Sequence, residues 1–269
     1  MKYVLDDLGP LTITAFRYSL AFILFLPFLL VRKGFGKYPP QLWGRFLLLG
    51  VSFYVVGNGA LYLGLKFIPA TTGSLLLSFV PLLVMLAGIL ILHEIPTRMQ
   101  FIGLVIVLTG GGVFFSPGLK SGEPVGIMIV SIGLLGNAAF DIIGREVQQK
   151  HLTSTLILTA LPLGIGGLLL LPLALLIEGL PQARLSVWAI IFLLASVNTA
   201  VVYALMNHAL KALPAFELAV ITNLTPLLTA LWSWILLREK LQVVQVAGIV
   251  LAILGIILVE RGMHQAQIP

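Results

Sequence analysis

The sequence predicts an all-α polytopic membrane protein, and three observations lead to that class. Hydrophobic residues make up 59% of the 269 residues and charged residues only 10%, whereas a soluble domain carries about 25% charged residues. The apolar residues form runs of roughly twenty, the length of a helix that crosses a hydrocarbon core about 30 Å thick. A pattern of prolines, glycines and a tryptophan also recurs at an offset of 145 residues. Because lipid offers no partner to backbone amides, each apolar run is expected to be a helix.

Nine such runs follow one another along the chain, and the short connections between them carry most of the charge. They use most of the chain and leave no room for a separate soluble domain. The predicted spans are Thr12–Val31, Leu42–Leu65, Ala70–Leu92, Met99–Ser116, Pro124–Arg145, Thr153–Ile177, Ser186–Ala209, Ala215–Leu237 and Val243–Glu260.

The repeat is clearest in residues 69–94 and 214–239, which both begin at a proline, carry a second proline and end at a glutamate. At the same offset the fifth span has no counterpart, because its partner would lie before the first residue. We therefore predict two related repeats, residues 1–119 with four helices and residues 120–269 with five, the first copy lacking its first helix. Either the protein evolved to nine spans, or the chain starts about one helix downstream of the ancestral start; both explanations stay open.

The repeat and the charges together predict a topology. A unit of five spans crosses the membrane an odd number of times, so the second copy must enter it upside down, as in the inverted repeats of many secondary transporters. Lys and Arg counted on alternating sides give nine on one side and six on the other. The richer side is expected to be cytoplasmic and to hold the C-terminus. The net charge of +6 is then expected to face anionic lipid headgroups rather than nucleic acid.

Several short motifs accompany the repeat. In both copies a proline is followed by two leucines and then by a glutamate, and two glycines seven residues apart come later. Pro10 with Arg17 in the first span, and Asn198-Thr-Ala with Tyr203 in the seventh, add to the pattern. Together these motifs resemble the EamA-type members of the drug/metabolite transporter superfamily, over essentially the whole chain.

This resemblance implies a ten-helix fold of two inverted five-helix repeats that acts as a permease for small metabolites, often in export. It implies a central cavity lined mainly by the first, third and fourth helices of each repeat. The expected partners are a small-molecule substrate, such as an amino acid or related metabolite, and the lipid bilayer of a bacterial-type cell membrane. Since the missing first helix is one of the cavity walls, a non-transporting truncated protein or an assembly partner of another chain is the alternative.

Polar side chains inside the spans are the candidates for substrate contact, because polar groups at such depth are rare. Asn58 and Tyr62 lie one helical turn apart, and the offset aligns them with Tyr203 and Asn207. They are expected either to line a ligand site on a pseudo-two-fold axis or to tie helices together by hydrogen bonds.

Asp141 is the most informative charge, about one turn from the predicted cytoplasmic end of its span. A carboxylate at mid-membrane costs roughly 2.5–3.5 kcal/mol, and less near the interface. The sequence favours an ion pair with Arg145, four residues later. The alternative is a proton or cation-substrate site, and therefore proton coupling.

Pro81 and Pro226 are expected to kink their spans and to free a carbonyl one turn upstream. Ser78, Asn223 and Thr225 precede them, and they are expected either to contact substrate there or to satisfy the freed carbonyl. The full set of cavity candidates is Asn58, Tyr62, Ser78, Asn137, Asp141, Asn198, Tyr203, Asn207, Asn223 and Thr225. A structural role is expected for Arg17, Pro81, Pro226, Glu94 and Glu239, with Arg17 snorkelling or contacting helix-end carbonyls.

Enzyme motifs do not occur in the sequence. His93-Glu94 lacks the second histidine of a zinc helix, and there is no glycine-rich phosphate-binding loop. The chain has no cysteine, so it has no thiol-based metal or redox site. We therefore predict a transporter without enzyme activity, bound metal or cofactor.

Overall fold

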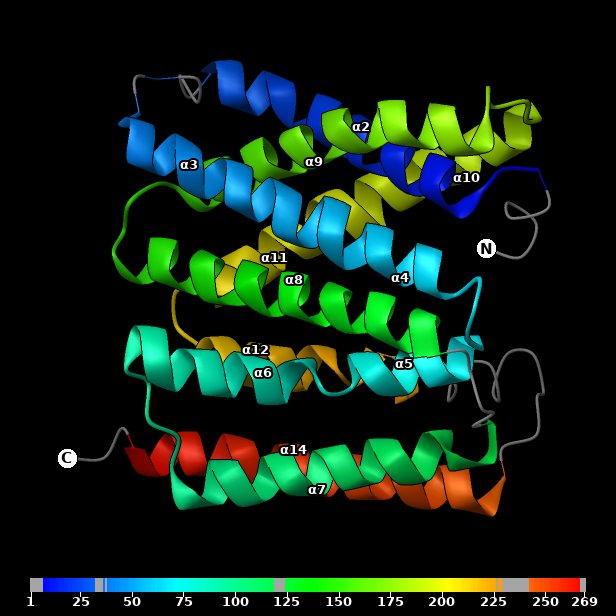
Figure 1. Cartoon of the computed structure of the whole chain (residues 1–269). Helices are drawn as coiled ribbons and strands as arrows, with labels where there is room; N and C mark the ends of the chain where they lie inside the picture. Colours follow the sequence, from blue (N-terminus) through cyan, green and yellow to red (C-terminus); the bar gives the residue numbers. More distant parts are fainter. Residues whose placement is uncertain are drawn as a thin grey trace. The chain divides into compact units, whose positions relative to one another are not determined.

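A computed structural model describes residues 7–31, 36, 38–118, 124–225, 227–228 and 242–266. The regular structure of this part of the chain is entirely helical (Figure 1). Eight of its helical segments are long and apolar enough to cross a membrane. They are α2 (Pro10–Val31), Pro40–Gly64 (α3, η1 and α4), Thr72–Leu92 (within α5, α6 and η2), α7 (Arg98–Phe115), α8 (Pro124–Gln149), α9 (Thr155–Glu178), Leu185–Ala209 (α10, η4 and α11) and Val243–Gly262 (within α14, Val243–Ala266).

These segments confirm the predicted all-α membrane fold, and most of their ends lie within two residues of the predicted ones. The predicted end of the fifth span at Arg145 is wrong by one turn, because α8 continues to Gln149. The charged residues there do not stop the helix: Lys150 Nζ donates to Glu146 Oε1, four residues earlier, at 2.7 Å. Of the predicted span Ala215–Leu237 the structure describes the first part only, and Pro226 and Glu239 lie outside the described residues.

The helices form two compact units. Unit 1 contains residues 1–62 and 143–212, and unit 2 contains residues 63–142 and 213–269. The boundaries fall inside α4 (Asn58–Gly64) and α8. Each unit therefore takes helices from both predicted repeats, and in each unit helices that the 145-residue offset relates lie together.

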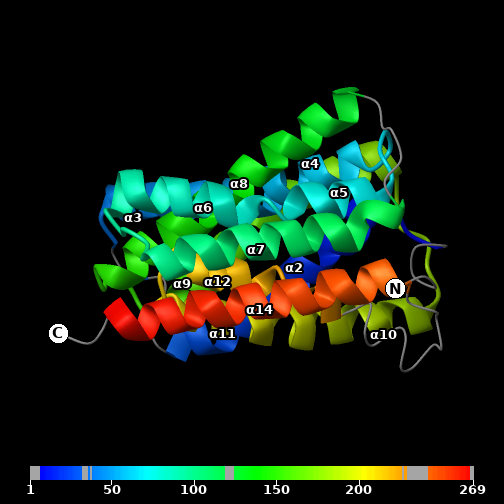
Figure 2. The same ribbon diagram turned by 90° about the horizontal axis from the view of Figure 1, so that it is seen from below.

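In unit 2 the offset-related helices α7 and α14 pack along each other (Figure 2). A Cβ placed on Gly103 would lie 2.6 Å from the carbonyl oxygen of Gly255, and one on Gly110 would lie 2.8 Å from that of Gly248. Since Gly103 corresponds to Gly248 and Gly110 to Gly255, each contact is the image of the other. The two helices run antiparallel, and glycines let their backbones touch.

In unit 1 the pair α2 and α9 is built in the same way (Figure 1). Gly164 faces the ring of Phe22, and Gly167 faces the backbone of Ser19. The offset relates Ser19 to Gly164 and Phe22 to Gly167, so these two contacts are again images of one another. The order of the contacts along the chain shows that α2 and α9 are antiparallel.

Both offset-related middle helices of unit 1 contain a π-helical stretch, η1 (Gly50–Gly57) and η4 (Leu194–Val201). Their positions agree to within one residue once the offset is applied. π-Helical turns are rare, and they occur frequently at functional sites. No signal in the sequence pointed to them.

Candidate functional site

The helix that follows Pro69 is broken at the position where its internal proline was expected to kink it. α5 (Ala70–Leu77) ends, two residues intervene, and α6 (Val80–Ala87) begins with buried Pro81 in its first turn. Ser78 lies in the break, and its Oγ donates to the carbonyl oxygen of Leu75 at 2.6 Å. Thus Ser78 hydrogen-bonds a carbonyl of the interrupted helix.

The second copy shows a comparable break. α12 (Ala215–Thr222) ends at Asn223, which is its C-terminal cap. Thr225 Oγ1 donates to the carbonyl oxygen of Thr222 at 2.7 Å. The hydroxyl of Thr225 therefore plays the part that Ser78 plays in the first copy, the satisfaction of a carbonyl at the break.

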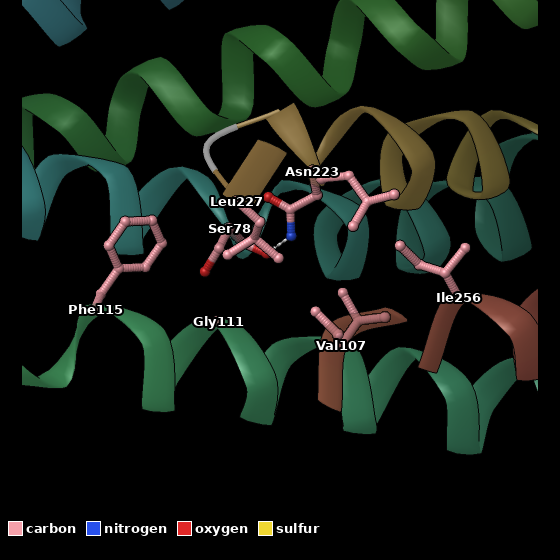
Figure 3. A pocket seen from close by; sticks show the side chains of 9 residues that line it. Ser78, Val107, Gly111, Phe115, Asn223, Leu227 and Ile256 are labelled. Carbon is pink, nitrogen blue, oxygen red and sulfur yellow. Dashed lines mark hydrogen bonds between the residues drawn. The ribbon is translucent and has the colours of Figure 1, made fainter. Parts of the chain in front are cut away.

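The two breaks meet inside unit 2. Asn223 Nδ2 donates to the carbonyl oxygen of Ser78 at 3.1 Å, and these two residues are themselves related by the 145-residue offset (Figure 3). A cavity of about 10 Å³ adjoins them, roughly the size of one water molecule. Its lining residues are Ser78, Val107, Gly111, Phe115, Asn223, Leu224, Leu227, Ala252 and Ile256.

A cluster of aromatic residues occupies the interior of unit 1. Tyr18 of α2 lies edge-on to Tyr54 of η1, with ring centroids 4.7 Å apart. Tyr203 of α11 (Val202–Ala209) lies 5.9 Å from Tyr54 and 5.6 Å from Phe53. The guanidinium of Arg17 stacks on the Tyr18 ring, 5.1 Å from its centroid. We call these five residues the Arg17–tyrosine cluster.

Asn207 lies in a buried hydrogen-bond network of unit 1. Its Nδ2 donates to Thr159 Oγ1 at 3.2 Å and to the carbonyl oxygen of Tyr203 at 3.1 Å. Gln148 Nε2 of α8 donates to the carbonyl oxygen of Asn207 at 2.8 Å. Asn207 is only 2% exposed, and the network ties α8, α9 and α11 together. These contacts are the helix tie that was the alternative to a ligand contact.

The remaining cavity candidates have different surroundings. Asn58 Nδ2 donates to the carbonyl oxygen of Phe53, five residues earlier in the π-helical stretch, at 2.9 Å. Asn137 Nδ2 donates within α8 to the carbonyl oxygen of Gly133 at 2.9 Å. Tyr62 and Asp141 are half-buried, and Asn198 of η4 is exposed. A substrate contact by any of these residues stays a prediction.

Among the predicted structural residues, Arg17 donates from its Nη2 to the hydroxyl of Tyr18 at 3.4 Å. The contact with helix-end carbonyls that was expected of Arg17 is made by Arg145, whose Nη1 donates to the carbonyls of Leu210 at 2.7 Å and Lys211 at 3.1 Å. Glu94 is half-buried just after η2 (Gly88–Leu92).

Sequence reasoning missed Glu178. Its carboxylate accepts from the backbone N–H of Leu11 at 3.0 Å and of Thr12 at 2.8 Å, and so caps the N-terminus of α2. A carboxylate at a helix N-terminus satisfies unpaired amides and complements the helix dipole. The residues are 166 and 167 positions apart, so no local pattern could have revealed the contact.

A larger cavity of about 590 Å³ opens on unit 1 between α2, α9, η4 and α11. Its walls are mainly apolar, with Thr155, Ser196 and His208 as the polar contributors. None of the predicted cavity residues line it. Within the described residues, no group of three or more His, Asp and Glu gathers in a way that could hold a metal ion.

The fold defines the class of protein: an integral, multi-pass membrane protein in which offset-related helices pair antiparallel through close glycine contacts. The sequence profile of the EamA-like transporter family matches residues 1–116 and 124–261. The chain therefore belongs to the EamA-like transporter family, and it is a membrane transporter in the general sense of that family.

Similar proteins extend over nearly the whole chain. The uncharacterized transporter YyaM of Bacillus subtilis is 27% identical, over 95% of this chain and 86% of its own length. An uncharacterized transporter of Archaeoglobus fulgidus is 24% identical, over 98% of this chain and 92% of its own length. A crystal structure with 17% identity superposes with a TM-score of 0.81, over 94% of this chain and 89% of that one, which shows a shared fold.

Proposed function

We propose that this chain is a secondary transporter that moves a small organic metabolite across the membrane by alternating access. The observation that carries the proposal is the pairing of offset-related helices in antiparallel orientation, Gly103 against Gly255 and Gly110 against Gly248. Alternating access in inverted-repeat transporters depends on two related halves that can exchange conformations around a midplane site. Pairs of contacts related by the repeat offset are expected in an inverted-repeat transporter.

The two helix breaks support the same function. Substrate and ion sites of secondary transporters are typically formed by interrupted helices near the bilayer midplane. Here both breaks contain a polar residue, and these residues, Ser78 and Asn223, touch each other beside a small cavity. We infer that the transport pathway passes this pair. Irregular backbone at membrane depth is tolerated where it lines a cavity or is buried in protein.

The proposal also includes a direction of transport and coupling to protons. The excess of Lys and Arg on one side of the membrane supports a cytoplasmic C-terminus in a bacterial-type cell membrane, and export is the direction of transport that the family resemblance favours. Asp141, half-buried in α8, is the carboxylate that we assign to proton coupling. Substitution of Asp141 by Asn is expected to remove the dependence of transport on a pH gradient.

The test is transport by the purified protein in proteoliposomes, with a panel of labelled amino acids and organic acids. For any substrate that moves faster than in protein-free vesicles, Asn223→Ala is expected to lower the initial rate roughly tenfold, equivalent to losing about 1.4 kcal/mol of transition-state stabilisation. Thr109→Ala is the matched control, because Thr109 is exposed and, among the residues that the structure describes, its hydroxyl donates to the carbonyl oxygen of Val105 in its own helix. If no compound of the panel crosses faster than in empty vesicles, the proposal is wrong.

A further inference from the structure

Arg17 is a buried cation whose contacts leave part of its charge unmatched. It lies seven residues after the start of α2, about 10 Å along the helix axis, and it is only 9% exposed. Among the described residues its hydrogen bond goes to the neutral hydroxyl of Tyr18, at the long distance of 3.4 Å, and its Nε has no partner. Buried charges are normally paired, because removal from water is costly.

Two other arginines of unit 1 have stronger hydrogen-bond acceptors than Arg17. Arg45 pairs with the carboxylate of Glu146 at 2.9 Å. Arg145 donates to two carbonyl oxygens at the end of α11. Both find strong acceptors, although Arg45 is far more exposed than Arg17. Arg17 therefore differs from these two arginines in having only a weak, neutral acceptor among the described residues.

The side chains around Arg17 are suited to an organic anion. The hydroxyl of Tyr18 accepts from Arg17 and shares a hydrogen bond with the hydroxyl of Tyr203, and a bound carboxylate would take the place of Tyr203 as its acceptor. The rings of Tyr18, Tyr54, Tyr203 and Phe53 form aromatic walls, each within 6.3 Å of a neighbouring ring centroid. A guanidinium binds a carboxylate through two parallel hydrogen bonds, and aromatic rings favour a planar apolar body beside it.

Two of these tyrosines lie in or next to π-helical stretches. Tyr54 lies within the π-helical stretch η1, and Tyr203 follows the π-helical stretch η4 by two residues. A π-helical turn interrupts the regular hydrogen-bond ladder and is frequent at functional sites. Two tyrosines of this cluster therefore lie in or directly after helix geometry of a kind that is frequent at functional sites.

We propose that Arg17, with Tyr18, binds the carboxylate of the transported substrate, so that the substrate class is a small organic acid with a planar, apolar body. This proposal rests on the transport function proposed above and names its substrate class. Arg17 is then a binding residue rather than a structural one, and its uncompensated charge is retained because the substrate supplies the counter-charge.

The experiment measures benzoate binding to the purified protein in detergent, from the rise in the unfolding temperature, because a ligand of the folded form stabilises it. Benzoate is expected to raise this temperature in a concentration-dependent manner, and benzyl alcohol, which lacks the carboxylate, is not. Inorganic phosphate is the second comparison. A rise in the unfolding temperature with phosphate but none with benzoate would contradict the carboxylate assignment.

Variants of Arg17 distinguish a role in ligand binding from a role in the stability of the fold. Arg17→Gln is expected to unfold no earlier than wild type without ligand, since an unmatched cation is removed, and to lose the benzoate shift. Arg17→Lys keeps the charge without the fork and is expected to bind benzoate roughly tenfold more weakly, as one charge-assisted hydrogen bond is lost. Arg45→Gln, a matched control at a paired arginine, is expected to retain the full shift.

An unchanged benzoate shift in Arg17→Gln, or no shift in wild type, would overturn the proposal. If Arg17→Gln fails to fold, the benzoate affinities of Arg17→Lys and Tyr18→Phe test the proposal instead, because both variants keep the aromatic rings. Wild-type affinity for benzoate in both variants would also overturn the proposal. Binding needs no gradient or vesicle, so a protein that binds benzoate through Arg17 but moves nothing in proteoliposomes would refute the transport function alone.

Discussion

Substitution of Gly110 by alanine should destabilise the protein, although alanine is the better helix former. The added Cβ would lie 2.6 Å from the backbone nitrogen of Ala252 and 2.8 Å from the carbonyl oxygen of Gly248. Ordinary van der Waals contact begins at 3.4 Å, so α7 and α14 would have to separate locally by about 0.8 Å, the difference between 3.4 and 2.6 Å. Overpacking costs about 1–3 kcal/mol and the helix preference for alanine returns about 1 kcal/mol. The net loss is expected to reach about 2 kcal/mol.

Gly112→Ala is the matched control on the same helix, because its Cβ would meet nothing within 4 Å. It should be as stable as wild type or gain up to about 1 kcal/mol. Thermal unfolding can be followed by the fluorescence of the four tryptophans, and thiol-reactive dyes have no target in a chain without cysteine. Gly255→Ala, the offset-related substitution, should lose about as much as Gly110→Ala. Equal stability of the Gly110→Ala and Gly112→Ala proteins would refute the close-packing argument.

Two further substitutions test contacts that hold unit 1 together. Glu178→Gln should lower the unfolding temperature by removing the charge that caps α2, a loss of about 1 kcal/mol; exposed Glu260 provides the control, and an equal effect of Glu260→Gln would exclude capping as the cause. Asn207→Ala should cost about 1–3 kcal/mol, because it removes two hydrogen bonds and leaves buried acceptors unsatisfied. Asn198→Ala, at an exposed position, should leave stability unchanged, so a loss as large as that of Asn207→Ala would contradict the assignment of Asn207 as a helix tie.

The positions of the spans could be predicted closely because the bilayer imposes a simple rule. An apolar run of about twenty residues must form a helix in lipid, and charge marks its ends. The rule failed where charge and helix coincide, at the end of α8, since Glu146 and Lys150 satisfy each other along the helix and Gln148 is held by Asn207.

The candidate site could be predicted only in part. Ser78 and Asn223 were found from the prolines that follow them, because a proline has a fixed local effect on a helix. That these two residues touch, and that Arg17 lies against Tyr18, which in turn lies against Tyr54, could not be inferred, since polar and aromatic residues occur throughout the spans. The hydrogen bonds of Arg145 to the carbonyls at the end of α11 could not be inferred either, since the sequence favoured an ion pair of Arg145 with Asp141.

The sequence by itself therefore determined the class of protein, the membrane spans and the 145-residue correspondence between them, because these depend on hydrophobicity and on local backbone chemistry. Only the tertiary structure decided which helices pair, which polar groups satisfy one another and which buried charge is left without a strong acceptor. Those outcomes depend on side chains far apart in the chain, such as Glu178 and the first turn of α2, and helix packing, not local sequence, sets the distances between them.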